Sequence, residues 1–472
     1  MTASATCAAQ PADMTAMRQA LADRRTTASA LVDVAIARAE AANAELNFIA
    51  LPTFDRARDQ AATSRPGPLG GIPTLIKDAV MEKGVPAYFG SEALRGFTAP
   101  DDSLYTRAIT ASGLISIARS TMPELGLNVV TESPLCGATR NPWNTDYAPG
   151  GSSGGASAAV AAGVVPAAHA TDGLGSIRHG AGPCGLVGLK PSRGRNFGDE
   201  AMRSISDLNV SGCVTRTVRD TALWLDATQS RDFAAPFAPV PLAFDPIDTP
   251  LRIHAYSAVM RTGNAADASV TRVFGDTIDL LTKLGHQVSD GRLPFDGSRA
   301  IQTLQDITEA MFSRRLGLLA EAIGMPIAID RLEHRSQTLI AAGNRIDDER
   351  YESAQRHAEN LASAYLAGFD HMDIWMTPTF STEPVRVGAF SPNTAWEDQR
   401  EALLDYAGYC WIDNFAGSTA ISLPMGFSGN GIPIGIQFAT RPGGEALLLA
   451  LAYQLEAVAP WWQQKPPLWL GD

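Results

Sequence analysis

The sequence predicts an α/β protein, because short apolar runs typical of strands alternate with longer segments of helical periodicity. Strand-type runs occur along most of the chain, at TLIKDAV (74–80), GLISIARS (113–120), LVGLK (186–190), LRIHAY (251–256), DIWMTPTF (373–380) and TAISLP (419–424). Helical spacing of apolar residues is clearest in three segments, from Thr26 to Asn47, at 219–228 and at 267–285. No internal repeat interrupts this alternation.

Each element has its own signal. Thr and Ser residues cap the helix that begins near Thr26, and SRPGPLGGIP (64–73) separates it from the first strand. An alanine-rich run that follows APGG (148–151) predicts a helix, and five prolines within 232–250 predict a surface crossing. The region from about 300 to 370 is mostly helical by pattern. A Gly/Asn turn joins the last two strands as a hairpin.

Composition narrows the class of function. The 472 residues are 45% hydrophobic and 19% charged, and 38 Lys and Arg against 50 Asp and Glu give a net charge of −12. That charge argues against nucleic acid and against an anionic membrane surface as partners, and favours a small molecule or a peptide. The N-terminus lacks the basic and apolar regions of a signal peptide, and no run is apolar enough to span a bilayer, so we expect a cytoplasmic protein.

Neither a metal nor a cofactor is expected. The five cysteines are widely spaced and form no CxxC pair, so a disulfide framework and a zinc site are not indicated. The chain contains no HExxH or GxxxxGK[ST] motif and no strand–GxGxxG–helix unit, which removes zinc peptidase, nucleotide-phosphate and dinucleotide functions.

The segment GGSSG (150–154) permits three interpretations. Glycine and serine are typical of flexible linkers, but glycines also let backbone approach a ligand closely while serines perform chemistry on it. The segment also satisfies GxSxG, the nucleophile elbow of α/β-hydrolases, which requires a histidine further along the chain. Candidates for that histidine are His254, His286, His334, His357 and His371.

A second glycine-flanked serine follows 24 residues later, in TDGLGSIRHG, at Ser176. We expect the two serine loops to face each other across the ends of the alanine-rich helix. Upstream, Lys77 lies in an apolar run beside Asp78, so the three residues Ser176, Ser152 and Lys77 supply a nucleophile, a relay and a base. The alternative for Lys77 is a buried ion pair with Asp78 or another carboxylate.

These motifs together resemble the amidase signature family, whose hallmark is GGSSGG followed by a TDxGGSIR-like element, with an earlier lysine in IKD. The resemblance extends from GGIPTLIKD through TMPELG, ATRNPWN, KPSRGR and CVTRTVRDTALWLD to AISLP and GIPIGIQ. Within the family, the chain is most similar to the branch that contains 6-aminohexanoate cyclic-dimer hydrolase. The resemblance implies one α/β/α domain over 1–472, with a central mixed sheet covered by helices on both faces. Its parts are a helical N-terminal part (1–65), the signature core (66–230) and the remaining sheet (251–472), with a variable substrate region at about 300–370.

The resemblance also implies the roles of the site residues. Ser176 is the expected nucleophile, and Ser152 matches the family's serine that follows a cis peptide bond and relays a proton to Lys77. Lys77 must then be neutral at working pH, which burial favours. Residues in supporting positions, which form hydrogen bonds and an Asp–Arg pair, are Ser153, Asp172 and Arg178. The alternative for each of them is plain loop capping. The oxyanion hole is expected from the backbone N–H groups of Gly173, Leu174, Gly175 and Ser176.

Three departures from the family pattern bear on the site. Leu174 stands where most relatives have glycine, His179-Gly180 where an apolar residue and proline are usual, and Thr121 where asparagine is usual. We expect the Leu174 side chain to narrow the site. His179 is expected at the surface, with a substrate contact as the alternative.

The leading hypothesis is a hydrolase that cleaves the carbon–nitrogen bond of a linear amide, anilide, cyclic amide or carbamate through an acyl-enzyme. Its alternatives are the glutamine amidase subunit of a tRNA-dependent amidotransferase, a biosynthetic acyl-transfer enzyme and a non-catalytic relative. For the oligomeric state, a homodimer is one possibility. A neutral, hydrophobic substrate is expected from the apolar residues of 122–130, 300–345 and 405–418, which are Met122, Leu127, Met311, Phe312, Tyr409, Trp411 and Phe415. The alternative for each of these side chains is a place in the core.

Overall fold

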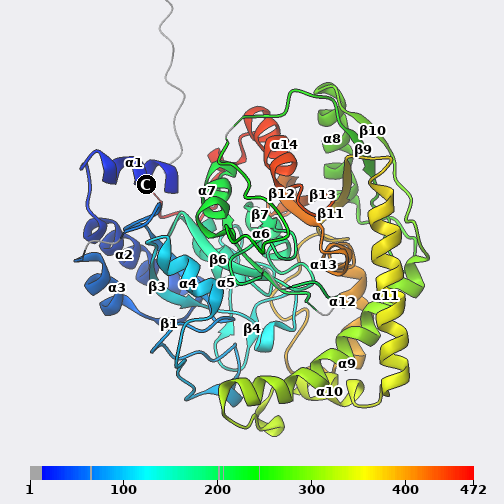
Figure 1. The fold of residues 1–472 in the computed structure, drawn as a ribbon, viewed down its shortest axis with the longest axis horizontal. Helices are drawn as coiled ribbons and strands as arrows, with labels where there is room; N and C mark the ends of the chain where they lie inside the picture. Colours follow the sequence, from blue (N-terminus) through cyan, green and yellow to red (C-terminus); the bar gives the residue numbers. More distant parts are fainter. Residues whose placement is uncertain (1–12, 64–65, 200–201, 206, 244, 472) are drawn as a thin grey trace, which may run out of the picture.

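A mixed eight-stranded sheet forms the centre of the molecule (Figure 1). The computed structural model describes residues 13–63, 66–199, 202–205, 207–243 and 245–471. The strand order is β10-β9-β11-β13-β12-β7-β8-β6. The pairs β10–β9 and β9–β11 are parallel, and the other adjacent pairs of this sheet are antiparallel. The strands are β6 Ala167–Asp172, β7 Val187–Lys190, β8 Val210–Thr215, β9 Arg252–Ala255, β10 Gln287–Asp290, β11 Ile374–Pro378, β12 Thr419–Phe427 and β13 Pro433–Thr440.

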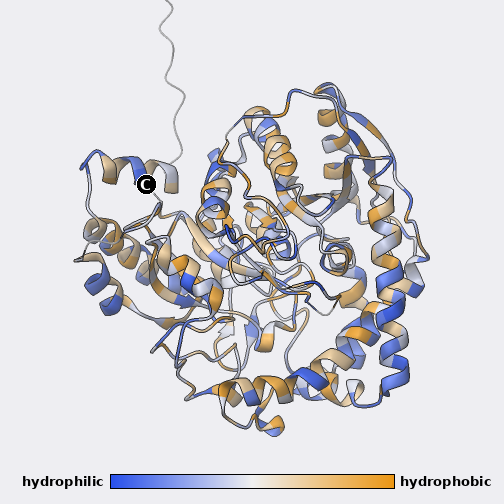
Figure 2. Cartoon of the chain, in the orientation of Figure 1, coloured by the Kyte–Doolittle hydropathy of each residue, from blue (hydrophilic) through white to orange (hydrophobic). Residues whose placement is uncertain are grey.

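Helices cover both faces of this sheet, as the sequence predicts for an α/β protein. Alternate residues of β11 point to opposite faces: Ile374 and Met376 pack in one apolar cluster and Trp375 in another. The first cluster contains α7 Val218–Thr228, α8 Ala268–Lys283 and α14 Glu445–Val458. The second contains α9 Gly297–Ile323, α11 Asp348–Gly368 and α13 Trp411–Ala416. In Figure 2 hydrophobic residues dominate α14, whereas α11 carries many hydrophilic ones.

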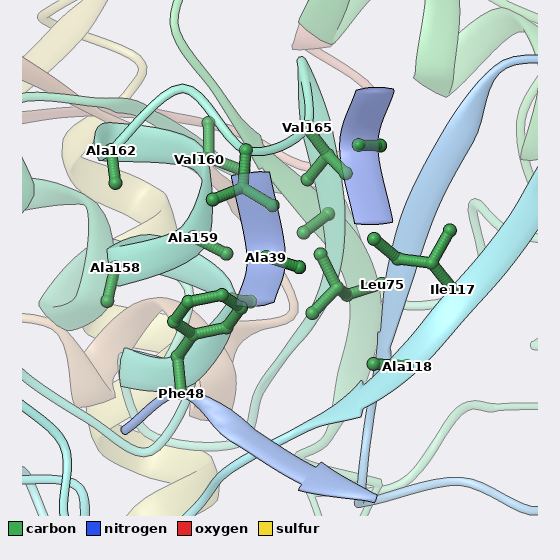
Figure 3. Close-up of a cluster of buried hydrophobic side chains, with 14 of the residues drawn as sticks. Ala39, Phe48, Leu75, Ile117, Ala118, Ala158, Ala159, Val160, Ala162 and Val165 are labelled. Carbon is green, nitrogen blue, oxygen red and sulfur yellow. The ribbon is translucent and has the colours of Figure 1, made fainter. Parts of the chain in front are cut away.

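A smaller three-stranded sheet lies beside the edge strand β6. Its order is β1-β3-β2, with β1 Ile49–Pro52, β3 Ile115–Ser120 and β2 Pro73–Lys77. The Thr74 hydroxyl of β2 donates to the Ala167 carbonyl of β6 at 2.9 Å, and both strands contribute to one apolar cluster (Figure 3). This contact places the end of β2, and with it Lys77, against the end of β6.

The remaining elements surround these two sheets. The helices are α1 Met14–Ala22, α2 Ala28–Leu46, α3 Phe54–Ala61, α4 Leu104–Ala111, α5 Gly154–Ala161, α6 Arg178–Cys184, α10 His334–Gly343 and α12 Trp396–Tyr406. Single 3₁₀ turns occur at Glu92–Leu94, Glu124–Gly126, Ile329–Arg331 and Trp461–Gln463, and β4 Glu132–Ser133 pairs with β5 Gly137–Ala138. Among the described residues, no helix is both long and apolar enough to cross a membrane.

One predicted element differs from the structure. The alanine-rich run after GGSSGG does not continue as a helix between the two serine loops. Helix α5 ends at Ala161, Gly163 turns the chain with a φ of +76°, and β6 then returns as a buried strand. Ser152 therefore lies just before helix α5 and Ser176 just after strand β6, because this strand of the central sheet occupies the second half of the chain between them.

Candidate active site

Lys77 is the last residue of β2 and is completely buried. Its Nζ lies 2.7 Å from Ser152 Oγ, 2.9 Å from Ser153 Oγ and 2.9 Å from Thr171 Oγ1. The backbone N–H of Lys77 donates to Nδ1 of His169 on β6 at 3.2 Å, which fixes the strand end. The Lys77 amine is thus within hydrogen-bond distance of three hydroxyl groups.

The GGSSG segment is a tightly packed turn rather than a linker. Ser152 and Ser153 are buried, and the peptide bond between Gly151 and Ser152 is cis. A Cβ atom at Gly154 would lie 2.3 Å from Thr131 Oγ1, and one at Gly155 would lie 2.3 Å from Thr121 Oγ1. The glycines are therefore required because neighbouring chain packs directly against them. The turn holds both serine hydroxyls at the lysine.

The hydrogen bonds around Lys77 constrain which group can give it a proton. Ser153 Oγ donates to the Thr171 carbonyl at 3.2 Å, so its own proton is already used and it accepts from Lys77. A neutral amine has two N–H donors and one lone pair. With its donors on Ser153 and Thr171, the lone pair of Lys77 faces the Ser152 hydroxyl.

Burial lowers the pKa of Lys77 to about 7, because the charged ammonium loses its hydration, while Asp172 opposes this shift. The ion pair with Asp78 is not formed. Asp78 instead accepts the backbone N–H groups of Tyr88 and Gly90 and lies 3.6 Å from the Arg119 guanidinium. A substantial fraction of Lys77 is therefore neutral near pH 7.

Ser176 lies in the turn that follows β6, is half-buried and lines the same cavity as Lys77 and Ser152. The Asp172 carboxylate organises this turn by accepting the N–H of Gly175 at 2.7 Å and of Ile177 at 3.2 Å. Of the four N–H groups expected in the oxyanion hole, that of Gly175 therefore already has an acceptor. The N–H groups of Gly173, Leu174 and Ser176 have no acceptor within the described part of the chain.

The predicted Asp172–Arg178 pair is present and fully buried. Arg178 Nε and Nη2 donate to the two oxygens of Asp172 at 3.0 and 2.9 Å. The remaining guanidinium donors bind Asp413, Gln437, Asn414 and the Cys410 carbonyl. The pair of charges holds the pKa of Asp172 below its usual range and that of Arg178 above it. This network ties the Ser176 turn to β13 and α13.

A cavity of about 300 Å³ opens onto these residues. It is lined mostly by apolar side chains from the 122–129 loop and from α9, α10 and α12. The predicted contacts that do line it are Met122, Leu127, Met311, Phe312, Trp411 and His179. Tyr409 and Phe415 do not line it: Tyr409 is buried and donates to the Ser257 carbonyl at 2.8 Å, and Phe415 packs in the core. For these two residues the core alternative was right.

His179 is not at the surface. Its ring is buried, stacks on Phe380 with centroids 4.7 Å apart, and would lie 2.4 Å from a Cβ at Gly175. Burial, with a smaller effect of Arg178, lowers the pKa of His179 to about 3. A surface position was expected because the sequence around it is glycine-rich, but α6 carries this segment under the cavity, where the ring fills the space beside the Ser176 turn.

Sequence reasoning missed four residues of the site. Thr171 is a third hydroxyl partner of Lys77, and Arg315, Arg335 and Trp396 line the cavity from the helical side. Only the position of Thr171, just before the conspicuous Asp172, could have indicated a role. No His among His254, His286, His334, His357 and His371 lines the cavity, so the nucleophile-elbow interpretation lacks its base. Within the described ranges, no cluster of His, Cys, Asp or Glu could hold a metal ion.

Comparisons with known proteins identify the family of the chain. The family model "Amidase" matches residues 30–449. The chain is 35% identical over 453 residues to the AmiC protein of Mycobacterium tuberculosis, covering 95% of both chains. It is 31% identical over 481 residues to 6-aminohexanoate-cyclic-dimer hydrolase of Paenarthrobacter ureafaciens, covering 97% of this chain and 96% of the relative.

Solved structures give the same result. A structure of 6-aminohexanoate cyclic dimer hydrolase superposes with a TM-score of 0.88 at 29% identity, covering 97% of this chain and 98% of the other. A bacterial aryl acylamidase of the amidase signature family, at 24% identity and a TM-score of 0.84 over 96% and 97% of the two chains, shares the fold. The chain therefore belongs to the amidase signature family and is an enzyme of the amidase class, a hydrolase of carbon–nitrogen bonds in amides.

Proposed function

We propose that the protein hydrolyses an amide through an acyl-enzyme on Ser176, with Ser152 as proton relay and Lys77 as base. The observation that carries this proposal is the buried Lys77 amine, held at 2.7 Å from Ser152 by two further hydroxyls and with a pKa lowered to about 7. A buried lysine used only for structure would be expected beside a carboxylate. Here its partners are hydroxyl groups that can exchange protons with it.

In the acylation step, Ser176 Oγ forms a bond to the carbonyl carbon of the amide. Its proton passes to Ser152 Oγ, and the Ser152 proton passes to the lone pair of Lys77 Nζ. The negative charge that develops on the carbonyl oxygen is stabilised by the free N–H groups of Gly173, Leu174 and Ser176. Removing one such donor from a hydrolase costs about a hundred- to a thousandfold in kcat.

The same chain of hydroxyls works in reverse to release the amine. Lys77, now protonated, returns a proton through Ser152 to the amide nitrogen, so the carbon–nitrogen bond breaks with a neutral leaving group. Water then attacks the ester on Ser176 and loses its proton to Ser152 and Lys77. Breakdown of this second intermediate releases the acid, and the proton held by Lys77 restores the Ser176 hydroxyl.

The cavity supports an amide with an apolar body as substrate. Its walls include Met122, Leu127, Met311, Phe312 and Trp411, and the half-buried Leu174 stands in the turn that carries Ser176. The relative at 31% identity is named for the hydrolysis of a cyclic amide dimer, which fits a cavity of this kind. Linear amides, anilides, cyclic amides and carbamates are the classes to screen.

Labelling with a fluorophosphonate, followed by intact-mass measurement and peptide mapping, tests the nucleophile. We expect a single adduct on Ser176 and none in Ser176→Ala. An adduct on Ser152 instead would favour the nucleophile-elbow interpretation. Release of ammonia from glutamine in preference to anilides would support the amidotransferase subunit, and transfer of the acyl group to an added amine in place of water would support the biosynthetic alternative.

A further inference from the structure

Arg335, the second residue of α10, is a buried cation without a hydrogen-bond acceptor. Its backbone N–H donates to the Pro392 carbonyl at 3.0 Å, and its side chain is 1% exposed. None of its three guanidinium nitrogens has a hydrogen-bond acceptor among the described residues. Burial of an unpaired charge is strongly unfavourable, so a group outside the described chain is needed to compensate it.

Among the described residues, the nearby carboxyl of Glu333 compensates this arginine only weakly at neutral pH. Burial lowers the pKa of Arg335 only to about 10, so it stays protonated. The acidic group that interacts with it is Glu333, whose carboxyl is itself buried. Burial, followed by the nearby Glu124, raises the pKa of Glu333 to about 8, so that this carboxyl is mostly protonated at pH 7. The positive charge of Arg335 is therefore left largely uncompensated.

The surroundings of Arg335 fix its orientation. Its Cζ lies over the Trp396 ring, 5.4 Å from the centroid. The indole Nε1 donates to Glu309 Oε1 at 2.7 Å, which holds the ring in place. Arg335 and Trp396 both line the cavity that contains Ser176. With one face against an aromatic ring, a guanidinium offers its N–H groups at its edge, in the plane that suits a carboxylate.

The cavity as a whole has a positive character that the protein lacks. The net charge of the chain is −12, yet the side chains that line the cavity and stay charged at neutral pH are those of Arg315 and Arg335, and no Asp or Glu of the described residues lines it. Arg315 is exposed on α9, whereas Arg335 is buried. A cavity lined by one sign of charge within apolar walls raises the local concentration of ligands of the opposite sign.

We propose that Arg335 binds a carboxylate of the substrate, so that the enzyme prefers amides with an apolar body and an anionic group away from the scissile bond. This inference rests on the proposed hydrolysis at Ser176, since it assigns the far end of the same substrate. It amends the expectation of a wholly neutral substrate, which came from the apolar residues alone.

Two matched pairs of anilides test the proposal with the full-length protein. One pair is glutaric acid monoanilide and the analogue in which a methyl ketone replaces the carboxylate. The other is N-butyryl-para-aminobenzoate and the matching methyl ketone, which places the carboxylate on the amine side. Release of the aromatic amine gives kcat/KM for all four compounds. We expect the acid of one pair to exceed its ketone by at least tenfold, and this ratio to fall towards one in Arg335→Met.

Arg345→Met is the matched control, because Arg345 is exposed, pairs with Glu397 and does not line the cavity. Arg345→Met should keep the wild-type ratio of acid to ketone kcat/KM. Arg335→Lys keeps the positive charge but loses the paired N–H donors of the guanidinium, so it should give an intermediate ratio. Ratios near one in both pairs for the wild-type protein overturn the carboxylate site, whether or not Arg335→Met folds. Hydrolysis of the ketone analogues, lost in Ser176→Ala, reports the proposed function separately.

Discussion

Arg178 and Arg335 are both buried beside the active site, but their surroundings are opposite. Arg178 donates to two aspartates, a glutamine, an asparagine and a carbonyl, and every one of its nitrogens has an acceptor. Arg335 has none among the described residues. The protein itself therefore supplies all the hydrogen-bond acceptors of Arg178, which stabilises the fold. The guanidinium of Arg335 gains its acceptors only when a ligand binds.

The same contrast separates the two sides of the cavity. On the side of the two sheets, the hydroxyls around Lys77 satisfy one another, so the geometry for chemistry exists before a substrate arrives. On the side of α9, α10 and α12, apolar residues and unpaired polar groups face the cavity or lie just behind it. The difference suggests that the first side determines the reaction and the second determines which amide reacts.

The largest effect is expected on the catalytic side. Ser176→Ala should abolish turnover, and Ser152→Ala and Lys77→Ala should each lower kcat by about a thousandfold or more, because the three residues act as one unit. The double variant of Ser152 and Lys77 should lose little beyond either single variant. Single-turnover kinetics with one anilide measures this.

Ser157→Ala is the control for that comparison. Ser157 is a buried serine of α5 that donates to the Ser153 carbonyl at 3.0 Å and does not contact Lys77. Its loss should leave kcat within about fivefold of the wild type, since a single neutral hydrogen bond is worth only about 1 kcal/mol. Losses at Ser152 and Lys77 that simply multiply would contradict a shared relay.

Stability should distinguish the two arginines directly. Arg178→Met leaves Asp172 buried without its partner and should lower the free energy of unfolding by about 3–5 kcal/mol. Arg335→Met removes an unpaired buried charge, so the free energy of unfolding without ligand should change by less than about 1 kcal/mol or increase. Urea unfolding of the two variants is the measurement, and an equal loss in both would show that Arg335 also serves the fold.

The pH dependence of activity should follow the catalytic side alone when the substrate is neutral. Lys77 is inactive as a base when protonated, and its pKa is about 7, so kcat/KM should rise with pH and reach half its plateau near pH 7. Below that midpoint the rate should fall about tenfold per pH unit. His179 does not contribute to this rise, because with a pKa of about 3 it stays neutral over the whole range.

Lys190, Glu333 and Glu456 also titrate in this range, and controls are needed for the first two. Lys190 is buried with a pKa lowered to about 7 by burial, and Lys190→Met should keep the wild-type midpoint if Lys77 is the base. Glu333 becomes charged near pH 8 beside Arg335, so it should affect substrates with a carboxylate more than neutral ones. If the midpoint of the pH profile shifts in Lys190→Met, the profile reports the titration of Lys190 and not that of Lys77.

Local signals in the sequence were enough for most of the fold and for the prediction that Lys77, Ser152 and Ser176 lie at one site. Lys77 in an apolar strand and the two glycine-flanked serines are marked by unusual residues close together in the chain. Strand β6 was not predicted, because Ala167, Ala168 and Ala170 favour helix. It is a strand only because it lies between β8 and β2. The role of Arg335 was not predicted for a similar reason. Its lack of hydrogen-bond acceptors among the described residues depends on how α9, α10 and α12 pack together.

The smallest effect is expected at Leu174, where the two sides of the cavity meet. Leu174 lies in the Ser176 turn and packs against the apolar cluster that includes α9 and α13. Leu174→Gly should widen the space at the carbonyl and raise kcat/KM for a bulky aryl amide relative to a small aliphatic amide by a few fold, about the value of one or two methylene groups. Leu174→Met keeps the volume and should leave the ratio near that of the wild type. If the glycine variant instead lost activity equally on both amides, the leucine would be needed to hold the N–H groups of the turn, and substrate width would be set by α9, α10 and α12 alone.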